Sequence, residues 1–163
     1  MKKIFIFIVL AFALLQIFQI DKTNPPVDQN ADFLTLKKTP KNIATLIKSA
    51  CYDCHSNETS YPWYANVQPF GWFLKDHINE GRRELNFSTF AAYEPRRQAK
   101  KLDEAAELIQ NGEMPLESYT LIHKEAKLTV DQKKLLTDYF NTMKNATMAQ
   151  NGLSETDLKH KKK

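Results

Sequence analysis

Residues 41–55 read Lys-Asn-Ile-Ala-Thr-Leu-Ile-Lys-Ser-Ala-Cys-Tyr-Asp-Cys-His, and this stretch decides the fold. Its apolar residues recur at the spacing of one helix face, and they are Ile43, Leu46, Ile47 and Ala50. The pattern predicts a short amphipathic helix that runs directly into the first cysteine. The two cysteines therefore lie at the end of a helix.

The two cysteines of the chain occur as Cys51-Tyr-Asp-Cys54-His55, which is a signature of c-type haem attachment. Positions i, i+3 and i+4 share one face of a helical turn. Two thiols can then bond to the two haem vinyl groups while the adjacent imidazole ligates the iron. The motif predicts one haem c, held covalently by Cys51 and Cys54, with His55 as the proximal iron ligand.

Three other interpretations of the motif are weaker. A disulfide between the cysteines would close a very small loop and leave His55 without a role. A thioredoxin-like redox pair requires a βαβ context, and the chain has no convincing strand pattern. A structural zinc site requires four ligands, and beyond the motif only isolated histidines remain.

The N-terminus predicts export. Lys2 and Lys3 precede an apolar run, residues 4–20, that is broken only by Gln16 and Gln19. A run of this length is near the lower limit for crossing a bilayer, so residues 1–20 are either a signal anchor or a cleaved signal peptide. The run ends without a small-x-small cleavage site, which favours an anchor. The two lysines would hold the N-terminus in the cytoplasm.

Length and composition fit one compact domain with appendages. The chain has 163 residues, of which 42% are hydrophobic and 26% charged, so extreme disordered or fibrous classes are excluded. We expect a linker at residues 21–40, a c-type haem-binding domain at 41–148 and a basic flexible tail at 149–163. The net charge of +4 comes largely from lysines at the two ends, so we expect no nucleic-acid partner.

The remaining elements are predicted to be helical. An aromatic-rich stretch, residues 61–73, leads into a helix that ends at about Leu85. Residues 95–110 form a helix with proline in its first turn and Gly112 just beyond its end. Thr129 and Gln132 form a capping box for the last helix. The predicted fold is all-α, with about four helices and long loops, preceded by an apolar N-terminal helix.

The sixth ligand of the iron has two main candidates. Met114 follows Gly112 on a loop, where its thioether is free to turn inward, and we expect it to be the distal ligand. His77 is the alternative and would give a bis-histidine site. His123 is expected at the haem edge as a hydrogen-bonding residue. Residues expected to line the haem pocket are Trp63, Trp72 and Arg82, the last as a partner for a propionate.

With these residues in view, the chain resembles a bacterial haem-binding domain family of small, membrane-anchored Cys-x-x-Cys-His proteins. The resemblance rests on four segments: Cys51-Tyr-Asp-Cys-His-Ser-Asn-Glu-Thr, Tyr61-Pro-Trp-Tyr, Gly81-Arg-Arg-Glu-Leu-Asn-Phe-Ser, and Gly112-Glu-Met-Pro-Leu followed by Tyr119-Thr-Leu-Ile-His. More distantly, the chain is similar to class I cytochrome c. That similarity implies a cytochrome c-like bundle around one haem, with Met114 as distal ligand and residues 135–140 in the packing helix.

Taken together, the sequence predicts a one-electron carrier at the bacterial inner membrane, with its domain facing the periplasm. Its expected partners are periplasmic or membrane redox proteins. Two other functions stay open: a peroxidase-like haem enzyme, in which His77 or His123 would act as the acid–base group, and a haem-based gas or redox sensor.

Overall fold

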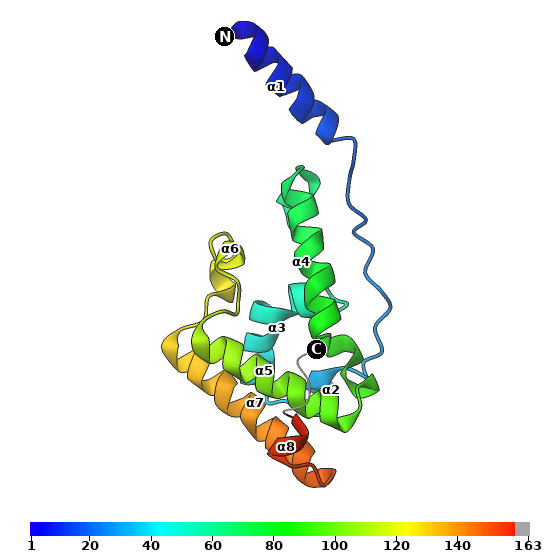
Figure 1. Cartoon of the computed structure of the whole chain (residues 1–163), viewed down its shortest axis with the longest axis vertical. Helices are drawn as coiled ribbons and strands as arrows, with labels where there is room; N and C mark the ends of the chain where they lie inside the picture. The colour runs from blue at the N-terminus through cyan, green and yellow to red at the C-terminus, as the bar shows by residue number, and fades with distance from the viewer. Residues whose placement is uncertain (159–163) are drawn as a thin grey trace.

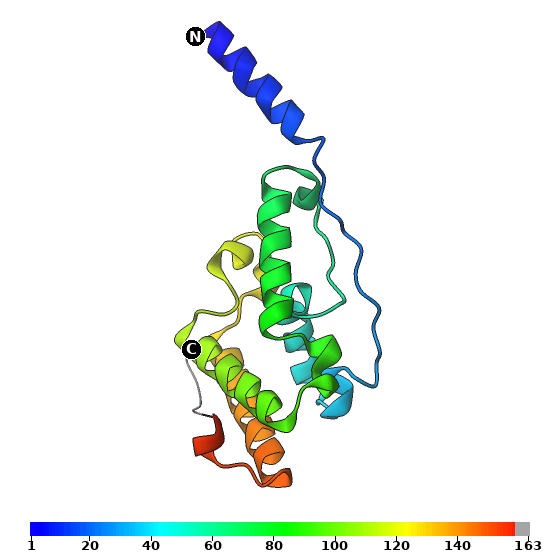
Figure 2. The same cartoon turned by 45° about the vertical axis from the view of Figure 1, so that its right-hand side comes forward.

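The computed structural model describes residues 1–158, and helices are the only regular secondary structure in that part of the chain. Figures 1 and 2 show its arrangement. The α-helices are α1 (Lys2–Leu15), α2 (Phe33–Leu36), α3 (Lys41–His55), α4 (Phe70–Glu84), α5 (Pro95–Asn111), α6 (Glu117–Thr120), α7 (Val130–Gln150) and α8 (Glu155–Leu158). Three 3-10 helices join them, namely η1 (Trp63–Asn66), η2 (Phe87–Ala92) and η3 (Lys124–Ala126). The prediction of an all-α fold is confirmed.

Local signals place the ends of the long helices. Pro95 occupies the first turn of α5, and Gly112 ends that helix in the left-handed conformation with a φ of 77°. Thr129 and Gln132 form the reciprocal capping box of α7. These helices are the longest of the domain, and both views show them side by side and antiparallel (Figures 1 and 2).

The main core lies where α3 crosses the α5–α7 pair. Ile43, Ile47 and Ala50 are buried at helical spacing on α3, as the sequence predicted. Around them lie aromatic rings from α2, η2 and α7, namely Phe33, Phe87, Phe90, Tyr139 and Phe140. The core is therefore apolar and rich in aromatic rings, and it supports the helix that carries the cysteine motif.

The linker was expected to span residues 21–40, but the packed part of the chain already begins at Asp32 and Phe33, before residue 41. Asp32 caps α2 by accepting a hydrogen bond from the Leu34 amide, which turns Phe33 inward. The Phe33 ring is fully buried and packs edge-on against Phe90, with ring centroids 4.9 Å apart. The polar, proline-bearing composition of the segment concealed this contact, because a single aromatic anchor has no periodicity.

The flexible tail was expected to begin at residue 149, but the chain remains packed beyond that residue. Helix α8 packs on α5, where Leu158 is buried with Ala99 and Met148. The packed part of the chain thus continues to Leu158. Residues 159–163, where the rest of the expected basic tail falls, lie outside the described residues.

Helix α1 exposes its apolar side chains and buries none of them. It spans 14 residues, ending at Leu15, whereas the apolar run in the sequence continues to Ile20. None of the helices in residues 1–158 has both the length and the apolar character required to traverse a bilayer.

Candidate functional site

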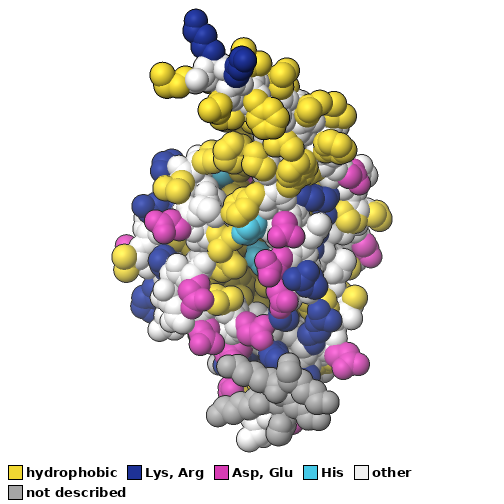
Figure 3. Space-filling model, turned by 45° about the horizontal axis from the view of Figure 1, so that its top comes forward, with side chains coloured by type: hydrophobic (Ala, Val, Ile, Leu, Met, Phe, Trp, Pro, Cys, Tyr) yellow, Lys and Arg dark blue, Asp and Glu magenta, His cyan; other side chains and the backbone are white. Residues whose placement is uncertain are grey.

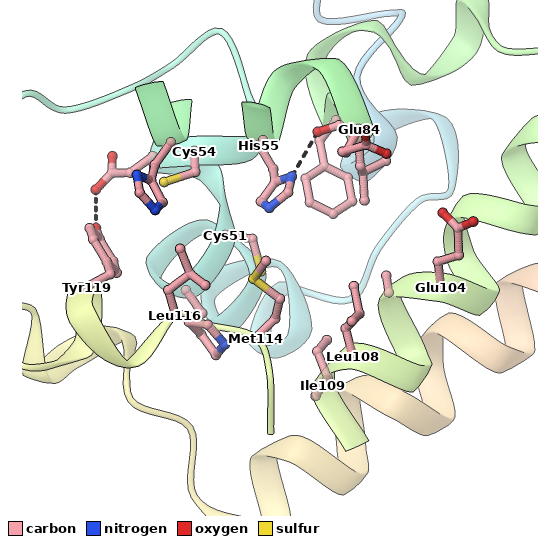
Figure 4. A pocket seen from close by; sticks show the side chains of 18 of the residues that line it. Cys51, Cys54, His55, Glu84, Glu104, Leu108, Ile109, Met114, Leu116 and Tyr119 are labelled. Carbon is pink, nitrogen blue, oxygen red and sulfur yellow. Dashed lines mark hydrogen bonds between the residues drawn. The ribbon is translucent and has the colours of Figure 1, made fainter. Parts of the chain in front are cut away.

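A cavity of about 360 Å³ lies between the last turn of α3, helix α4, helix α5 and the loop after Gly112. Figure 4 shows it from close by. Its walls are largely apolar, with contributions from Leu85, Phe87, Leu108, Ile109 and Leu116. Pockets for organic cofactors have this size and character, with a few polar groups that set orientation.

Both cysteines of the motif line the cavity and carry free thiols. Burial raises the pKa of Cys51 to about 12, and it raises the pKa of Cys54 to about 11 with a further contribution from the nearby Asp53 carboxylate. Both groups are therefore neutral thiols at pH 7. They project from one face of α3 into the same apolar space (Figure 4).

The third motif residue is held in one orientation by the end of α4. The Nδ1 atom of His55 lies 3.0 Å from the carbonyl oxygen of Leu85. Because a carbonyl only accepts, Nδ1 carries the proton and Nε2 keeps its lone pair. Burial lowers the pKa of His55, which favours the neutral ring. A neutral imidazole with one nitrogen bonded to a carbonyl is the usual form of a metal-ligating histidine.

Gly81 allows α4 to pass close to the motif. A Cβ atom at this position would lie 2.6 Å from the Cys54 carbonyl oxygen and 3.2 Å from the Cys54 Cβ atom. A side chain at this point would therefore push the two helices apart. The close approach brings the C-terminal end of α4, and with it the Leu85 carbonyl, to His55.

Met114 and His77 line the same cavity as His55. Met114 belongs to the loop after α5, and its amide donates to the Leu108 carbonyl over 3.2 Å. The Nδ1 atom of His77 contacts the Phe73 carbonyl over 2.8 Å, which leaves Nε2 as its other ring nitrogen. The structure therefore brings both expected distal candidates to the site.

His123 occupies a different position, outside the cavity lining. Its Nε2 atom pairs with the Tyr64 hydroxyl at 2.9 Å, and its Nδ1 atom lies 3.2 Å from a Glu125 carboxylate oxygen. The ring also stacks on Tyr119, whose hydroxyl donates to Asp53 within the motif. His123 therefore contacts the cavity wall through its stack on Tyr119 and does not itself line the cavity.

The three residues expected to line the pocket do not do so. Trp63 is 75% exposed on η1, and the indole of Trp72 donates to the Phe18 carbonyl. Arg82 points the other way, where its guanidinium donates to the Ser56 carbonyl over 2.8 Å. The expectation failed because aromatic density in a sequence does not distinguish a pocket wall from an exposed surface.

Lys101 at the cavity edge was not predicted from the sequence. Its ammonium group donates to Glu84 over 3.1 Å and to Glu104 over 2.7 Å, so one cation joins α4 to α5. The Glu84 carboxyl has a lowered pKa because it accepts this hydrogen bond. No sequence signal marks Lys101, since one lysine among many in a helix predicts an exposed residue.

The arrangement suits an apolar planar cofactor that is bonded through two thiols and ligated by one imidazole. A family model described as a haem-binding domain matches residues 10–142. That segment includes the helical motif, the cavity and both distal candidates. No curated protein and no solved structure matches the chain.

Proposed function

The chain belongs to the haem-binding domain family, and on that premise we propose that it is a covalent c-type haem protein that transfers single electrons. Cys51 and Cys54 would each hold the haem through a thioether, formed by addition of the thiol to a vinyl group with no net oxidation, and His55 would ligate the iron. One observation carries the proposal: the three motif residues face a single apolar cavity, and the Leu85 carbonyl leaves Nε2 of His55 available.

The chemistry of the cavity residues fits the cofactor. The apolar walls match a porphyrin face, and the half-buried thiols lie in the same last turn of α3 as the imidazole. When bound, haem supplies an iron that changes its charge by one electron. The protein would hold that iron through His55 and a distal ligand, and the apolar cavity walls would limit its contact with water.

Met114 is the proposed distal ligand, with His77 as the alternative. A carrier needs both axial positions filled by the protein, so that the iron exchanges electrons without binding a substrate. Two candidate side chains on different segments of the cavity support such a six-coordinate site. Apolar loop residues beside Met114, among them Leu116, would shield the thioether from water.

A membrane location is part of the proposal. The exposed apolar side chains of α1 follow Lys2 and Lys3, an order that fits an anchor with its N-terminus in the cytoplasm. The haem domain would then face the periplasm of a bacterial inner membrane. Its partners would be redox proteins of the periplasm or of the same membrane.

A second function is favoured by one observation. His77 lines the cavity with Nε2 as its remaining ring nitrogen, so it could act as an acid–base group in a peroxidase-like enzyme if the sixth position were open. A haem-based gas or redox sensor would use the same open position.

An absorption spectrum separates these functions. The protein should be produced with c-haem maturation machinery and recorded in both oxidation states, with and without carbon monoxide. A six-coordinate iron that is insensitive to carbon monoxide supports the electron carrier. A five-coordinate iron that binds carbon monoxide readily would instead support the enzyme or the sensor.

A further inference from the structure

Four aromatic side chains are exposed together where the domain meets the N-terminal segment. Trp63, Phe70, Trp72 and Phe73 are 75%, 60%, 38% and 57% exposed, and they form what we call the aromatic tip. The set includes both tryptophans of the chain. Contiguous exposed apolar surface of this kind marks an interaction site in a folded domain.

The aromatic tip is hydrogen-bonded to the exit of the apolar N-terminal run. Gln16 Oε1 accepts from the Gln68 amide over 2.8 Å, and Gln16 Nε2 donates to the Gln68 carbonyl over 3.1 Å. The Trp72 indole donates to the Phe18 carbonyl over 2.8 Å. Gln19 Nε2 donates to the Asn66 carbonyl over 3.3 Å. The two polar residues of the apolar run are therefore both hydrogen-bonded to backbone groups of Asn66 and Gln68, beside the aromatic tip in sequence.

The apolar surface is continuous from α1 to the domain. Ile17 and Phe18, just beyond α1, are 71% and 65% exposed. Figure 3 shows hydrophobic side chains running from the N-terminal helix onto the end of the domain that faces it. A cation lies at the same end of the domain: the Lys22 ammonium group is held there by donating to the Asn66 side chain.

The segment after Ile20 is bound along the domain. Asn24 donates to the Thr59 carbonyl over 2.9 Å and accepts from Arg82 over 2.8 Å. The Pro26 carbonyl accepts from Asn57 over 3.0 Å. We call residues 21–32 the strap. Its hydrogen bonds to the domain keep the domain close to the end of the apolar run. A freely swinging domain would lack these contacts.

We infer that the aromatic tip inserts into the headgroup region of a lipid bilayer and fixes the orientation of the cavity relative to the membrane. The inference rests on the proposed anchoring by α1. Tryptophan suits that layer because its amphipathic indole prefers the boundary between water and hydrocarbon, and the apolar phenylalanine rings would enter the adjoining acyl region. Lys22 supplies a cation at the level of anionic headgroups. The bilayer is the occupant that covers the tip and the exposed apolar surface of α1 at once.

The test uses the full chain with its haem, reconstituted into vesicles of phosphatidylethanolamine and phosphatidylglycerol that contain a diazirine-bearing lipid. After irradiation, labelled peptides are mapped by mass spectrometry. Label should appear in α1 and in residues 61–75, at a level on the order of tenfold above the peptide that carries Val130. Val130 is the control because it is apolar and 84% exposed but lies on α7.

A double variant, Phe70→Ser with Phe73→Ser, should lower the label on Trp63 several-fold and leave the label in α1 unchanged. Val130→Ser should change neither. Label in α1 with none in residues 61–75 would overturn the inference while the anchor stands, and it would assign the tip to a protein partner or a second copy of the chain. Label in neither segment would overturn both the inference and the anchor.

Discussion

The Nδ1 atom of His55 and the carbonyl oxygen of Leu85 lie 3.0 Å apart, and this contact decides which nitrogen the imidazole presents to the cavity. It joins the last residue of α3 to the residue that ends α4. The contact depends on the close passage of the two helices at Gly81. The orientation of the proximal ligand is therefore a consequence of helix packing as well as of the motif.

Replacing Met114 by alanine should open the sixth position of the iron. The variant should lose the weak near-infrared band of sulfur-to-iron coordination, bind carbon monoxide and show a lower reduction potential, because thioether ligation favours ferrous iron. The thioether bonds should persist. His77→Ala and His123→Ala are the matched controls and should keep the band. Loss of six-coordination in His77→Ala, with Met114→Ala unchanged, would assign a bis-histidine site instead.

Gly81→Ala should destabilise the domain by about 1–3 kcal/mol, the usual cost of overpacking. Alanine favours a helix over glycine by about 1 kcal/mol, so the destabilisation must come from the added methyl group at the Cys54 backbone. Chemical denaturation of the haem protein measures it. Asn79→Ala, at an exposed position of the same helix, is the control and should be neutral or mildly stabilising. An equally stable Gly81→Ala would show that the two helices can separate freely.

Phe33→Ala should lower the free energy of unfolding by about 3–5 kcal/mol, as expected for removing a buried aromatic ring. Leu36→Ala in the same short helix should cost far less, because Leu36 is 41% exposed. Urea denaturation of both variants tests whether the segment before α3 belongs to the core. Equal effects would mean that α2 is only loosely attached.

Lys101→Gln should remove a stabilisation that depends on pH. The pKa of Glu84 is lowered below its ordinary value of 4.5 by its hydrogen bond to Lys101. A carboxyl group with a lowered pKa in the folded state stabilises the fold above its unfolded pKa, and this contribution is lost as the pH falls through the folded pKa. The difference between wild type and variant should therefore be largest near neutral pH and shrink below about pH 4.5.

The size of that difference should stay within about 1 kcal/mol, because the Glu84 side chain is 60% exposed. Lys134→Gln is the control, since Lys134 pairs with Asp138 on an open helix face. It should change stability less at every pH. A Lys101→Gln difference that does not vary between pH 7 and pH 3 would exclude the Glu84 pair as its source.

The features predicted from the sequence are those with local signals. The burial of Ile43 and Ile47 follows from their helical spacing. The end of α5 at Gly112 follows from a glycine placed just after the last periodic residue. The capping box of α7 follows from Thr129 and Gln132 lying three residues apart. Each of these depends on contacts within one or two turns of chain. Such contacts can be read without knowing the tertiary fold.

The features that were missed depend on contacts between distant segments. Phe33 is buried by rings contributed from η2 and α7, and the Leu85 carbonyl reaches His55 only because α4 crosses α3. Arg82 looked available for a propionate, yet its guanidinium binds the Ser56 carbonyl. A motif predicts which side chains carry chemistry, whereas the walls around them follow from packing.

The most direct test of the account is whether haem stays bonded to the polypeptide after denaturation. The wild-type protein, made with c-haem maturation machinery, is run on a denaturing gel, stained for haem peroxidase activity and weighed as an intact chain. For the wild type, the account predicts staining at the polypeptide, a mass increase of one haem and no free thiol. The staining and the added mass should both be absent from the double variant Cys51→Ala with Cys54→Ala. Haem that separates from the wild-type chain on denaturation would contradict it.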